Sequence, residues 1–205
     1  MHLFALILGI WLLPKGDTLT CFECTQNNSR CDAIQRDCPS ENHQCGVSRV
    51  IVYEGGSKVR DLNVKGCVLN EECGEGSGNS GYFNISVNTL CCNSNLCNTQ
   101  SVPEPSKKTP NGRQCFTCDA PACNKTLDCV GNEDYCGFGT VDVGATYTIN
   151  GCISKKLCSA LNGYLSQILK TQITCAKGNF CNSAVTASAG LQLVVVALVS
   201  LTLFS

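Results

Sequence analysis

The sequence is poor in the residues that usually carry catalysis or bind metals. Its 205 residues contain 2 histidines, 1 tryptophan and 1 methionine, and 6% are aromatic. His43 lies in a polar Glu-Asn-His-Gln stretch that offers no nucleophile beside it. No activated nucleophile with a base, no carboxylate pair and no phosphate-binding glycine motif can be recognised. We therefore expect a protein that is not an enzyme, with no catalytic residue, no metal and no cofactor.

Charge is sparse as well. Charged residues make up 15% of the chain and the formal net charge is -1. Because no basic stripe with interleaved aromatic residues is present, nucleic acid is excluded as a partner. The acidic run Glu71-Glu72-Cys73-Gly74-Glu75 lies in a glycine-rich stretch. We interpret it as solvated charge rather than as an ion site.

The sequence also lacks an apolar run of membrane-spanning length. The C-terminal run from Leu191 to Ser205 is uncharged but falls short of the about 20 residues that a spanning helix needs. The small residues Asn182, Ser183 and Ala184 precede it, followed by a spacer of eight residues, Val185 to Gln192. This is the pattern of a glycosylphosphatidylinositol attachment signal. It predicts a lipid on Asn182, with Ser183 as the next choice, and removal of residues 183–205. A single-span or tail-anchored helix is the alternative.

What the chain has in abundance is cysteine, with 19 residues. Such a content indicates either a disulfide scaffold or a metal array. Residues 1–18 decide between them, because their apolar run followed by Pro14 and Gly16 is typical of a secretory signal peptide, cleaved after Thr18 or after Thr20. Disulfides persist in the secretory route, so the cysteines are expected to be paired.

The cysteines form two arrays that match step by step. The first array is Cys21, Cys24, Cys31, Cys38, Cys45, Cys67, Cys73, Cys91, Cys92 and Cys97. The second is Cys115, Cys118, Cys123, Cys129, Cys136, Cys152, Cys158, Cys175 and Cys181. Both open with C-x-x-C and end with Cys-Asn, which indicates an internal duplication. The predicted domains are residues 19–98 and 115–182.

Residues 99–114 join the two units. This segment has three prolines, no cysteine and a single aliphatic residue, Val102. We expect an extended, exposed linker, in which Lys107, Lys108 and Arg113 could be cut by a trypsin-like protease.

Within each unit the local patterns predict β-structure. Val50 to Tyr53 and Lys58 to Val64 flank a glycine turn and predict a hairpin, and a shorter copy surrounds Gly144. Residues 82–90 alternate apolar and polar side chains, as in a half-buried strand. The stretch from Leu157 to Leu169 is the nearest to a helical pattern, and the sequence leaves it undecided. Units of this size bury a small core, so disulfides are expected to supply stability, at about 2–4 kcal/mol each.

The two arrays resemble the three-finger LU family, which includes the urokinase receptor, snake three-finger toxins and gamma-type phospholipase inhibitors. The resemblance rests on Leu19-Thr20-Cys21-Phe22-Glu23-Cys24 and on Cys91-Cys92-Asn93-Ser94-Asn95-Leu96-Cys97-Asn98. It implies a small disulfide-rich all-β fold, with two tandem three-finger, snake-toxin-like domains.

The family pattern also implies a pairing that spacing alone cannot choose. In domain 1 the implied pairs are Cys21–Cys45, Cys24–Cys31, Cys38–Cys67, Cys73–Cys91 and Cys92–Cys97. In domain 2 they are Cys115–Cys136, Cys118–Cys123, Cys129–Cys152 and Cys158–Cys175. Ala176 stands where domain 1 has Cys92, so Cys181 loses its partner.

Two alternatives concern this cysteine. Pairing Cys175 with Cys181 would leave Cys158 free instead. An unpaired Cys181 would form an intermolecular disulfide, giving a dimer, or stay a buried and unreactive thiol.

Three N-glycosylation sequons begin at Asn27, Asn84 and Asn124. With the resemblance, they favour a lipid-anchored glycoprotein on the outer face of the cell membrane, with shed or secreted forms, that binds extracellular protein partners through its finger loops. The alternative function is inhibition of phospholipase A enzymes. A gamete or adhesion role is not separable by sequence.

Overall fold

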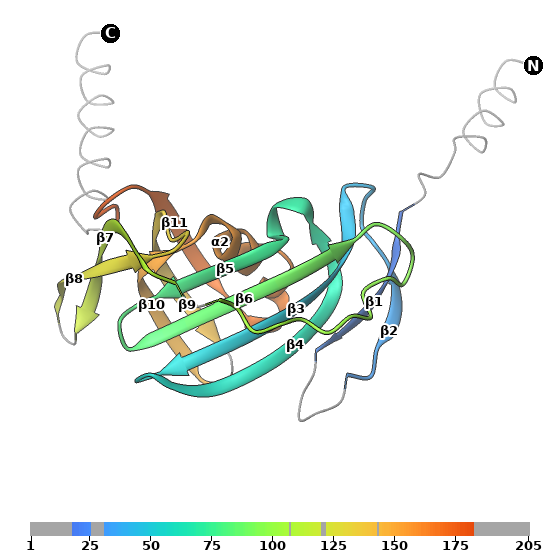
Figure 1. Cartoon of the computed structure of the whole chain (residues 1–205), viewed down its shortest axis with the longest axis horizontal. Helices are drawn as coiled ribbons and strands as arrows, with labels where there is room; N and C mark the ends of the chain where they lie inside the picture. Colours follow the sequence, from blue (N-terminus) through green and yellow to red (C-terminus); the bar gives the residue numbers. More distant parts are fainter. Residues whose placement is uncertain (1–17, 26–30, 107, 120–121, 143, 183–205) are drawn as a thin grey trace, which may run out of the picture.

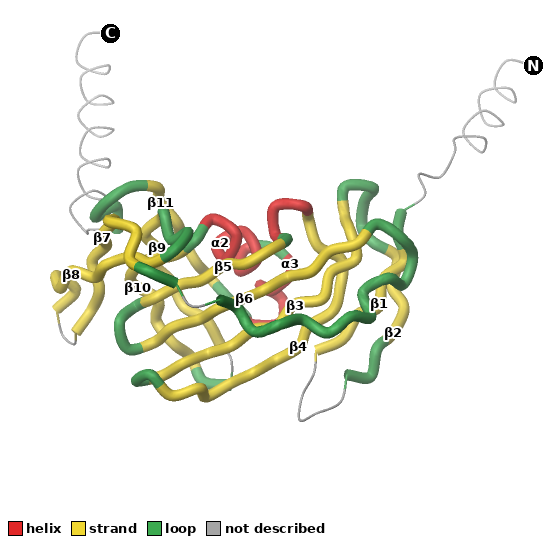
Figure 2. Tube along the Cα trace, viewed as in Figure 1, coloured by secondary structure: helices red, strands yellow, loops and turns green. Residues whose placement is uncertain are grey.

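The computed structural model describes residues 18–25, 31–106, 108–119, 122–142 and 144–182 (Figures 1 and 2). All of the predicted signal peptide except Thr18, the sequon asparagine Asn27 and the predicted C-terminal propeptide lie outside these residues. Within them the chain is built mainly of β-strands, as the sequence patterns predict. The all-β, disulfide-rich fold class is confirmed.

Domain 1 contains three pairs of strands joined at a common base. Its elements are β1 (Thr20–Thr25), β2 (Ile34–Asp37), β3 (His43–Glu54), β4 (Ser57–Leu69), the short 3-10 helix η1 (Asn70–Glu72), β5 (Gly74–Asn79) and β6 (Phe83–Cys92). The hairpin predicted around the glycine turn is β3–β4. Gly55 and Gly56 both adopt positive φ, 56° and 83°, which a tight hairpin turn needs and which glycine adopts without strain.

Domain 2 repeats the first two fingers and alters the third. Its elements are β7 (Pro110–Asp119), β8 (Ala122–Val130), β9 (Tyr135–Asp142), β10 (Thr146–Ile153), α2 (Lys155–Asn162), α3 (Tyr164–Leu169) and β11 (Gln172–Lys177). β7 begins inside the segment that the sequence predicts to be linker. The stretch that the sequence left undecided is helical, and it begins at the N-cap Ser154, whose side chain accepts a hydrogen bond from the Leu157 amide over 3.2 Å.

The two domains share one sheet. The strand order is β11-β9-β10-β5-β6-β3-β4-β1-β2, and β7 and β8 form a separate two-stranded sheet. The domains join where β10 pairs antiparallel with β5, with Ile153 opposite Gly78 and Cys152 opposite Asn79. Backbone hydrogen bonds therefore cross the domain boundary.

The two domains also share one core. Helices α2 and α3 lie on the face of β3, β4 and β6 that carries Val50, Val64 and Ile85. Leucines at four-residue spacing on the helices complete the cluster: Leu157, Leu161, Leu165 and Leu169. Each is at most 2% exposed, so the helical third finger of domain 2 is a packing element for domain 1.

Glycine in β5 makes this close approach possible. A Cβ atom on Gly76 would lie 2.8 Å from the backbone nitrogen of Leu157, and one on Gly78 would lie 3.1 Å from a Leu157 methyl carbon. A larger residue at either position would push α2 away from the sheet.

Candidate binding surface

Disulfides fix the base of each domain. In domain 1 the bonded pairs are Cys21–Cys45, Cys24–Cys31, Cys38–Cys67, Cys73–Cys91 and Cys92–Cys97. In domain 2 they include Cys115–Cys136, Cys129–Cys152 and Cys158–Cys175. Cys118 is also disulfide-bonded, and the side chain of its expected partner Cys123 lies outside the described residues. The alternative pair of Cys175 with Cys181 is not formed.

The closing segments of the two domains make equivalent hydrogen bonds to each domain's first strand. In domain 1 the Thr20 amide donates to the Asn95 side chain over 3.0 Å, and the Leu96 amide donates to the Thr20 carbonyl over 2.7 Å. In domain 2 the Gln114 amide donates to Asn179 over 3.1 Å, and Phe180 donates to the Gln114 carbonyl over 2.9 Å. The loop therefore keeps its shape without the disulfide that closes it in domain 1.

The asparagine after the last cysteine ties the end of each domain to its first strand. Asn98 donates to the carbonyls of Phe22 and Gly46 over 2.9 and 2.8 Å and accepts from the Phe22 amide. Asn182 donates to the Phe116 carbonyl over 2.7 Å and accepts from the Phe116 amide over 3.0 Å. The sequence shows this asparagine in the repeated Cys-Asn ending, but sequence analysis did not predict its contact with the first strand.

Cys181 is the free cysteine among the described residues, and it is partly exposed. Its Sγ atom lies 2.9 Å from the Ala176 carbonyl oxygen and 3.3 Å from that of Gly178. The thiol thus points back toward the strand position that carries Cys92 in domain 1.

Sulfur atoms gather at both bases without forming a metal site. Cys21, Cys38 and Cys67, and likewise Cys115, Cys129 and Cys152, place their sulfurs within 4.8 Å of one another. Every one of these sulfurs belongs to a disulfide, so none is available as a thiolate ligand.

Two buried carboxyl groups lie where the domains meet. Glu133 is 1% exposed and accepts from the Ser77 hydroxyl over 2.6 Å and from the Val130 amide over 3.0 Å. Glu72 is 3% exposed and accepts from the amides of Leu69 and Tyr164 over 2.6 and 3.3 Å. Burial raises the pKa of both carboxyl groups. The interpretation of Glu72 as solvated charge is wrong. Its buried carboxylate accepts hydrogen bonds from the N-cap residue of η1 and from the first residue of α3.

A hydroxyl cluster completes the contact between the domains. The Tyr164 hydroxyl from α3 reaches Ser48 and lies 3.3 Å from the Thr89 hydroxyl. Ser48 and Thr89 are themselves 2.8 Å apart and fully buried. Burial raises the pKa of Tyr164 to about 12, so the phenol stays protonated within this cluster at physiological pH.

The linker lies along the other face of the domain 1 sheet. It is extended as expected, but it is not simply exposed, since Val102 is 6% exposed. Glu104 receives a hydrogen bond from Tyr53 over 3.0 Å and an ion pair from Lys58 over 3.2 Å. Lys108 donates to the Ser77 hydroxyl over 3.2 Å. The segment is bound along its length by charged and polar contacts.

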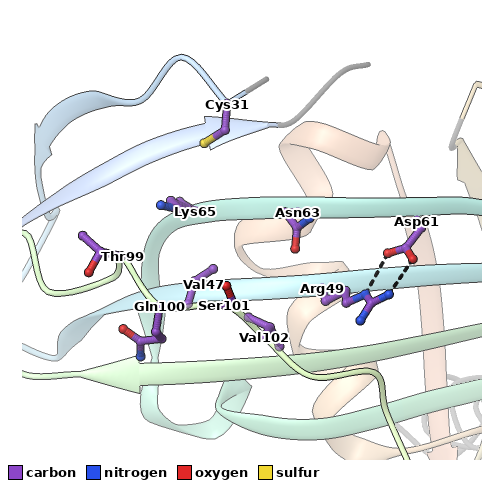
Figure 3. Close-up of a pocket in the computed structure, with 10 residues that line it drawn as sticks. All are labelled: Cys31, Val47, Arg49, Asp61, Asn63, Lys65, Thr99, Gln100, Ser101 and Val102. Atoms are coloured by element: carbon purple, nitrogen blue, oxygen red, sulfur yellow. Dashed lines mark hydrogen bonds and ion pairs between the residues drawn. The ribbon is translucent and has the colours of Figure 1, made fainter. Parts of the chain in front are cut away.

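Two cavities lie between this linker and the sheet. The larger, about 610 Å³, is bordered by β4 and residues 99–102, and Figure 3 shows Asp61, Asn63 and Lys65 along the strand. Arg49 closes one end by donating to both carboxylate oxygens of Asp61 over 2.9 and 2.7 Å, which lowers the pKa of that carboxyl. The smaller cavity, about 380 Å³, is bordered by β3, β6, the linker and domain 2.

The fingertips of the two domains converge at one edge of the molecule. The Gly55 amide in the β3–β4 turn donates to the Tyr82 carbonyl in the β5–β6 turn over 2.9 Å. Across the domain boundary, the Tyr147 hydroxyl donates to Glu54 over 3.4 Å, and the Arg60 guanidinium lies against Gly144. Tyr82 is 67% exposed here. We call Glu54, Arg60, Tyr82 and Tyr147 the fingertip cluster.

Two of the three sequon asparagines can be placed. Asn84 lies in β6 and borders the smaller cavity, where it is half-buried. Asn124 lies in β8 and is exposed.

The chain belongs to the u-PAR/Ly-6 domain family, whose family model matches residues 17–100 and 111–184. It is 25% identical over 188 residues to the urokinase plasminogen activator surface receptor of Bos taurus, covering 83% of this chain and 56% of the receptor. It is 24% identical over 170 residues to phospholipase A2 inhibitor CNF of Crotalus durissus terrificus, covering 75% of this chain and 82% of the inhibitor. The chain thus spans about half the length of the receptors that it matches.

Among solved structures, mouse TEX101 aligns over 72% of this chain and 87% of its own, at 16% identity and a TM-score of 0.32. Within the described ranges, no helix of this chain is long and apolar enough to cross a membrane.

Proposed function

We propose that this chain is a lipid-anchored cell-surface protein that binds an extracellular protein partner through the fingertip cluster. The observation that carries the proposal is the convergence of both domains at that cluster, where exposed Tyr82 lies beside charged side chains. Loops held on a rigid scaffold are the usual place for binding residues. The shared sheet and core supply that scaffold.

The chemistry of the cluster suits a protein partner. Tyrosine and arginine are over-represented among the residues that contribute most to protein interfaces. Tyr82 offers an apolar ring with a polar hydroxyl, and Arg60 and Glu54 offer charges of both signs. Because Gly55 and Tyr147 hold the neighbouring turns in place, little loop ordering would be needed on binding.

The predicted anchor is compatible with binding through the fingertip cluster. Attachment at Asn182 uses the backbone carbonyl, so the side chain can keep its hydrogen bonds to Phe116. Ser183 is the next position and lies outside the described residues. In Figure 1 the described chain ends at the upper left of the molecule and the β3–β4 turn lies at the lower left, so the fingertips do not lie beside an anchor placed after residue 182.

Release from intact cells tests the anchor. A phosphatidylinositol-specific phospholipase C should release the mature protein into the medium, and a version with the C-terminal tail replaced by a spanning helix should stay on the cells. Retention of the natural chain after the same treatment would contradict the lipid anchor.

Surface display of the chain against a library of secreted proteins tests the binding surface. Tyr82→Ala should weaken binding of the captured partner by about 1–3 kcal/mol, the range of an interface anchor. The control is Ile34→Ala, another exposed apolar residue, on β2 at 56% exposure. Equal effects of the two variants would argue against the cluster.

Inhibition of phospholipase A enzymes is the second candidate. It is favoured by one observation, that the chain is 24% identical to phospholipase A2 inhibitor CNF over 75% of its own residues. The purified ectodomain should then inhibit a secreted phospholipase A2 at stoichiometric concentration. No inhibition at a large excess would remove this candidate.

A disulfide-linked dimer through Cys181 is part of the proposal. The thiol is partly exposed and lies next to the predicted lipid. A dimer band on a non-reducing gel that disappears with Cys181→Ser would support it, and a monomer band from oxidised cells would contradict it.

A further inference from the structure

We propose that the smaller cavity holds the first N-acetylglucosamine of a glycan on Asn84, with the Tyr53 ring as its stacking surface. The inference rests on the proposed extracellular location, because N-glycans are added in the secretory route. It assigns to the cavity an occupant that belongs to the chain's own mature form. The Asn84 glycan would then differ from an ordinary surface glycan in having its first sugar enclosed by protein.

The first support is the placement of the sequon. Asn84 and Ser86 alternate with the buried residues of β6, so both face the linker side of the sheet. Both border the cavity of about 380 Å³, which falls in the range of about 300–1,000 Å³ typical of small-molecule sites. A sugar on Asn84 would enter this cavity before it reached solvent.

The second support is the carboxamide itself. Among the described residues, Asn84 has no side-chain hydrogen bond, whereas Asn79 and Asn88 on the same sheet each use theirs. An asparagine that is half-buried in a strand usually satisfies its amide. The side-chain nitrogen of Asn84 is therefore available for attachment of a glycan.

The third support is the cross-strand neighbour. Tyr53 in β3 lies directly opposite Asn84 in the antiparallel register. Opposite residues on one face have Cβ atoms about 4.5–5.5 Å apart, so a sugar joined to Asn84 would lie over the ring. The Tyr53 hydroxyl is held by Glu104 over 3.0 Å, which fixes the ring beneath the cavity. The apolar face of a pyranose ring packs on such an aromatic surface.

The covalent step is the ordinary one of N-glycosylation. An oligosaccharide on a lipid pyrophosphate carrier is transferred to the Asn84 side-chain nitrogen while the chain is still extended. The bond from sugar C1 to the pyrophosphate oxygen breaks, a C1–N bond forms, and lipid pyrophosphate and a proton leave. Folding of β6 against β3 and the linker then encloses the first sugar.

Site-resolved glycopeptide mass spectrometry of the full chain secreted from mammalian cells tests occupancy. Asn84 should carry a glycan in the natural chain and in Ser86→Thr, which keeps the sequon, and none in Ser86→Ala. An unmodified Asn84 beside an occupied Asn124 would overturn the inference and leave the extracellular location intact. Absence of glycan at both Asn84 and Asn124 would count against the inference and against the extracellular location.

Enzymatic release then tests enclosure. Peptide N-glycosidase should remove the Asn84 glycan from the native protein at least about tenfold more slowly than the exposed Asn124 glycan, because release requires local opening. The two rates should become equal after reduction and denaturation. Tyr53→Ala should speed native release at Asn84, and Phe138→Ala, which removes an exposed ring on β9, should not. Equal native rates at Asn84 and Asn124 would show a surface glycan and overturn the inference.

Discussion

The ring of Phe83 in domain 1 stacks on the ring of Tyr147 in domain 2, with centroids 4.4 Å apart and planes inclined by 18°. Phe83 is buried in the shared core, while Tyr147 is partly exposed at the fingertip cluster. This pair therefore connects the packing between the domains to the surface that we propose binds a partner.

A double-mutant cycle measures this contact. Phe83→Ala and Tyr147→Ala should be coupled by about 0.5–1.5 kcal/mol in urea unfolding, the usual value of an aromatic pair beyond its burial. Phe83→Ala combined with Phe116→Ala, whose ring packs on Phe180 instead, should be additive within about 0.5 kcal/mol. Additive behaviour of the first pair would mean that the stacking contributes nothing to stability.

The shared core predicts that one helix substitution destabilises both domains. Leu161→Ala should lower the free energy of unfolding by about 2–5 kcal/mol, because it leaves a cavity between α2 and the domain 1 sheet. Lys155→Ala, exposed on the same helix, should change it by no more than about 0.5 kcal/mol. Fluorescence and hydrogen exchange should report one common transition. Separate transitions for the two domains would contradict a shared core.

Restoring the missing cysteine should close the second domain's loop. Ala176→Cys should pair with Cys181, because the loop backbone already matches that of domain 1 and the Cys181 sulfur lies beside residue 176. The bond should add about 2 kcal/mol of stability by restricting the unfolded chain. Thiol labelling after denaturation should detect one free thiol in the natural monomer and none in the variant. Persistent labelling of the variant would show that the geometry does not allow the bond.

The buried Glu133 should make stability depend on pH. Its pKa is raised by burial, against the smaller opposing effects of Ser77, Val130 and Lys108. A raised carboxyl pKa in the folded state means that its contribution is fully present below the unfolded value of about 4.3 and is lost as pH rises through the folded pKa. The stability of the natural chain relative to Glu133→Gln should therefore fall as pH rises above the unfolded value of about 4.3.

Glu104 provides the control of opposite sign. Its pKa is lowered by the hydrogen bond from Lys58, so its contribution is present above the unfolded value and is lost on acidification. Urea unfolding of both glutamine variants should give slopes of opposite sign, above about pH 4 for Glu133→Gln and below it for Glu104→Gln. A flat difference for Glu133→Gln would mean that burial does not perturb this carboxyl group.

The bound linker should resist trypsin. Cleavage after Lys108 requires breaking its hydrogen bonds to Ser77 and Asn132, and Arg113 lies in β7 paired with Asp134. Lys107, the neighbouring site, lies outside the described residues. Glu104→Lys should speed cleavage because it repels Lys58 and Arg49, whereas Glu41→Lys at an exposed position should not. Mass spectrometry of the fragments over time reads out the difference, and rapid cleavage of the natural linker would show that these contacts are weak.

The sequence by itself determined the features that depend on local pattern and covalent spacing. The matching cysteine spacings show the duplication. Turn chemistry predicts the hairpin at Gly55 and Gly56, and the two-residue period of a strand predicts β6. The resemblance to the three-finger family extended this to the fold. These signals lie within short stretches of sequence, so they can be recognised before any tertiary contact is known.

Only the tertiary structure decided how the two units meet. The helical third finger of domain 2 has an ambiguous pattern, because its leucines become a packing face only when the domain 1 sheet lies against them. Glu72 looks like solvated charge until η1 and α3 enclose it. The burial of Val102 and the cavity beside Asn84 likewise arise from where the linker crosses the sheet. The local pattern of a segment does not say which distant segment it packs against, so these contacts are known only once the chain is folded.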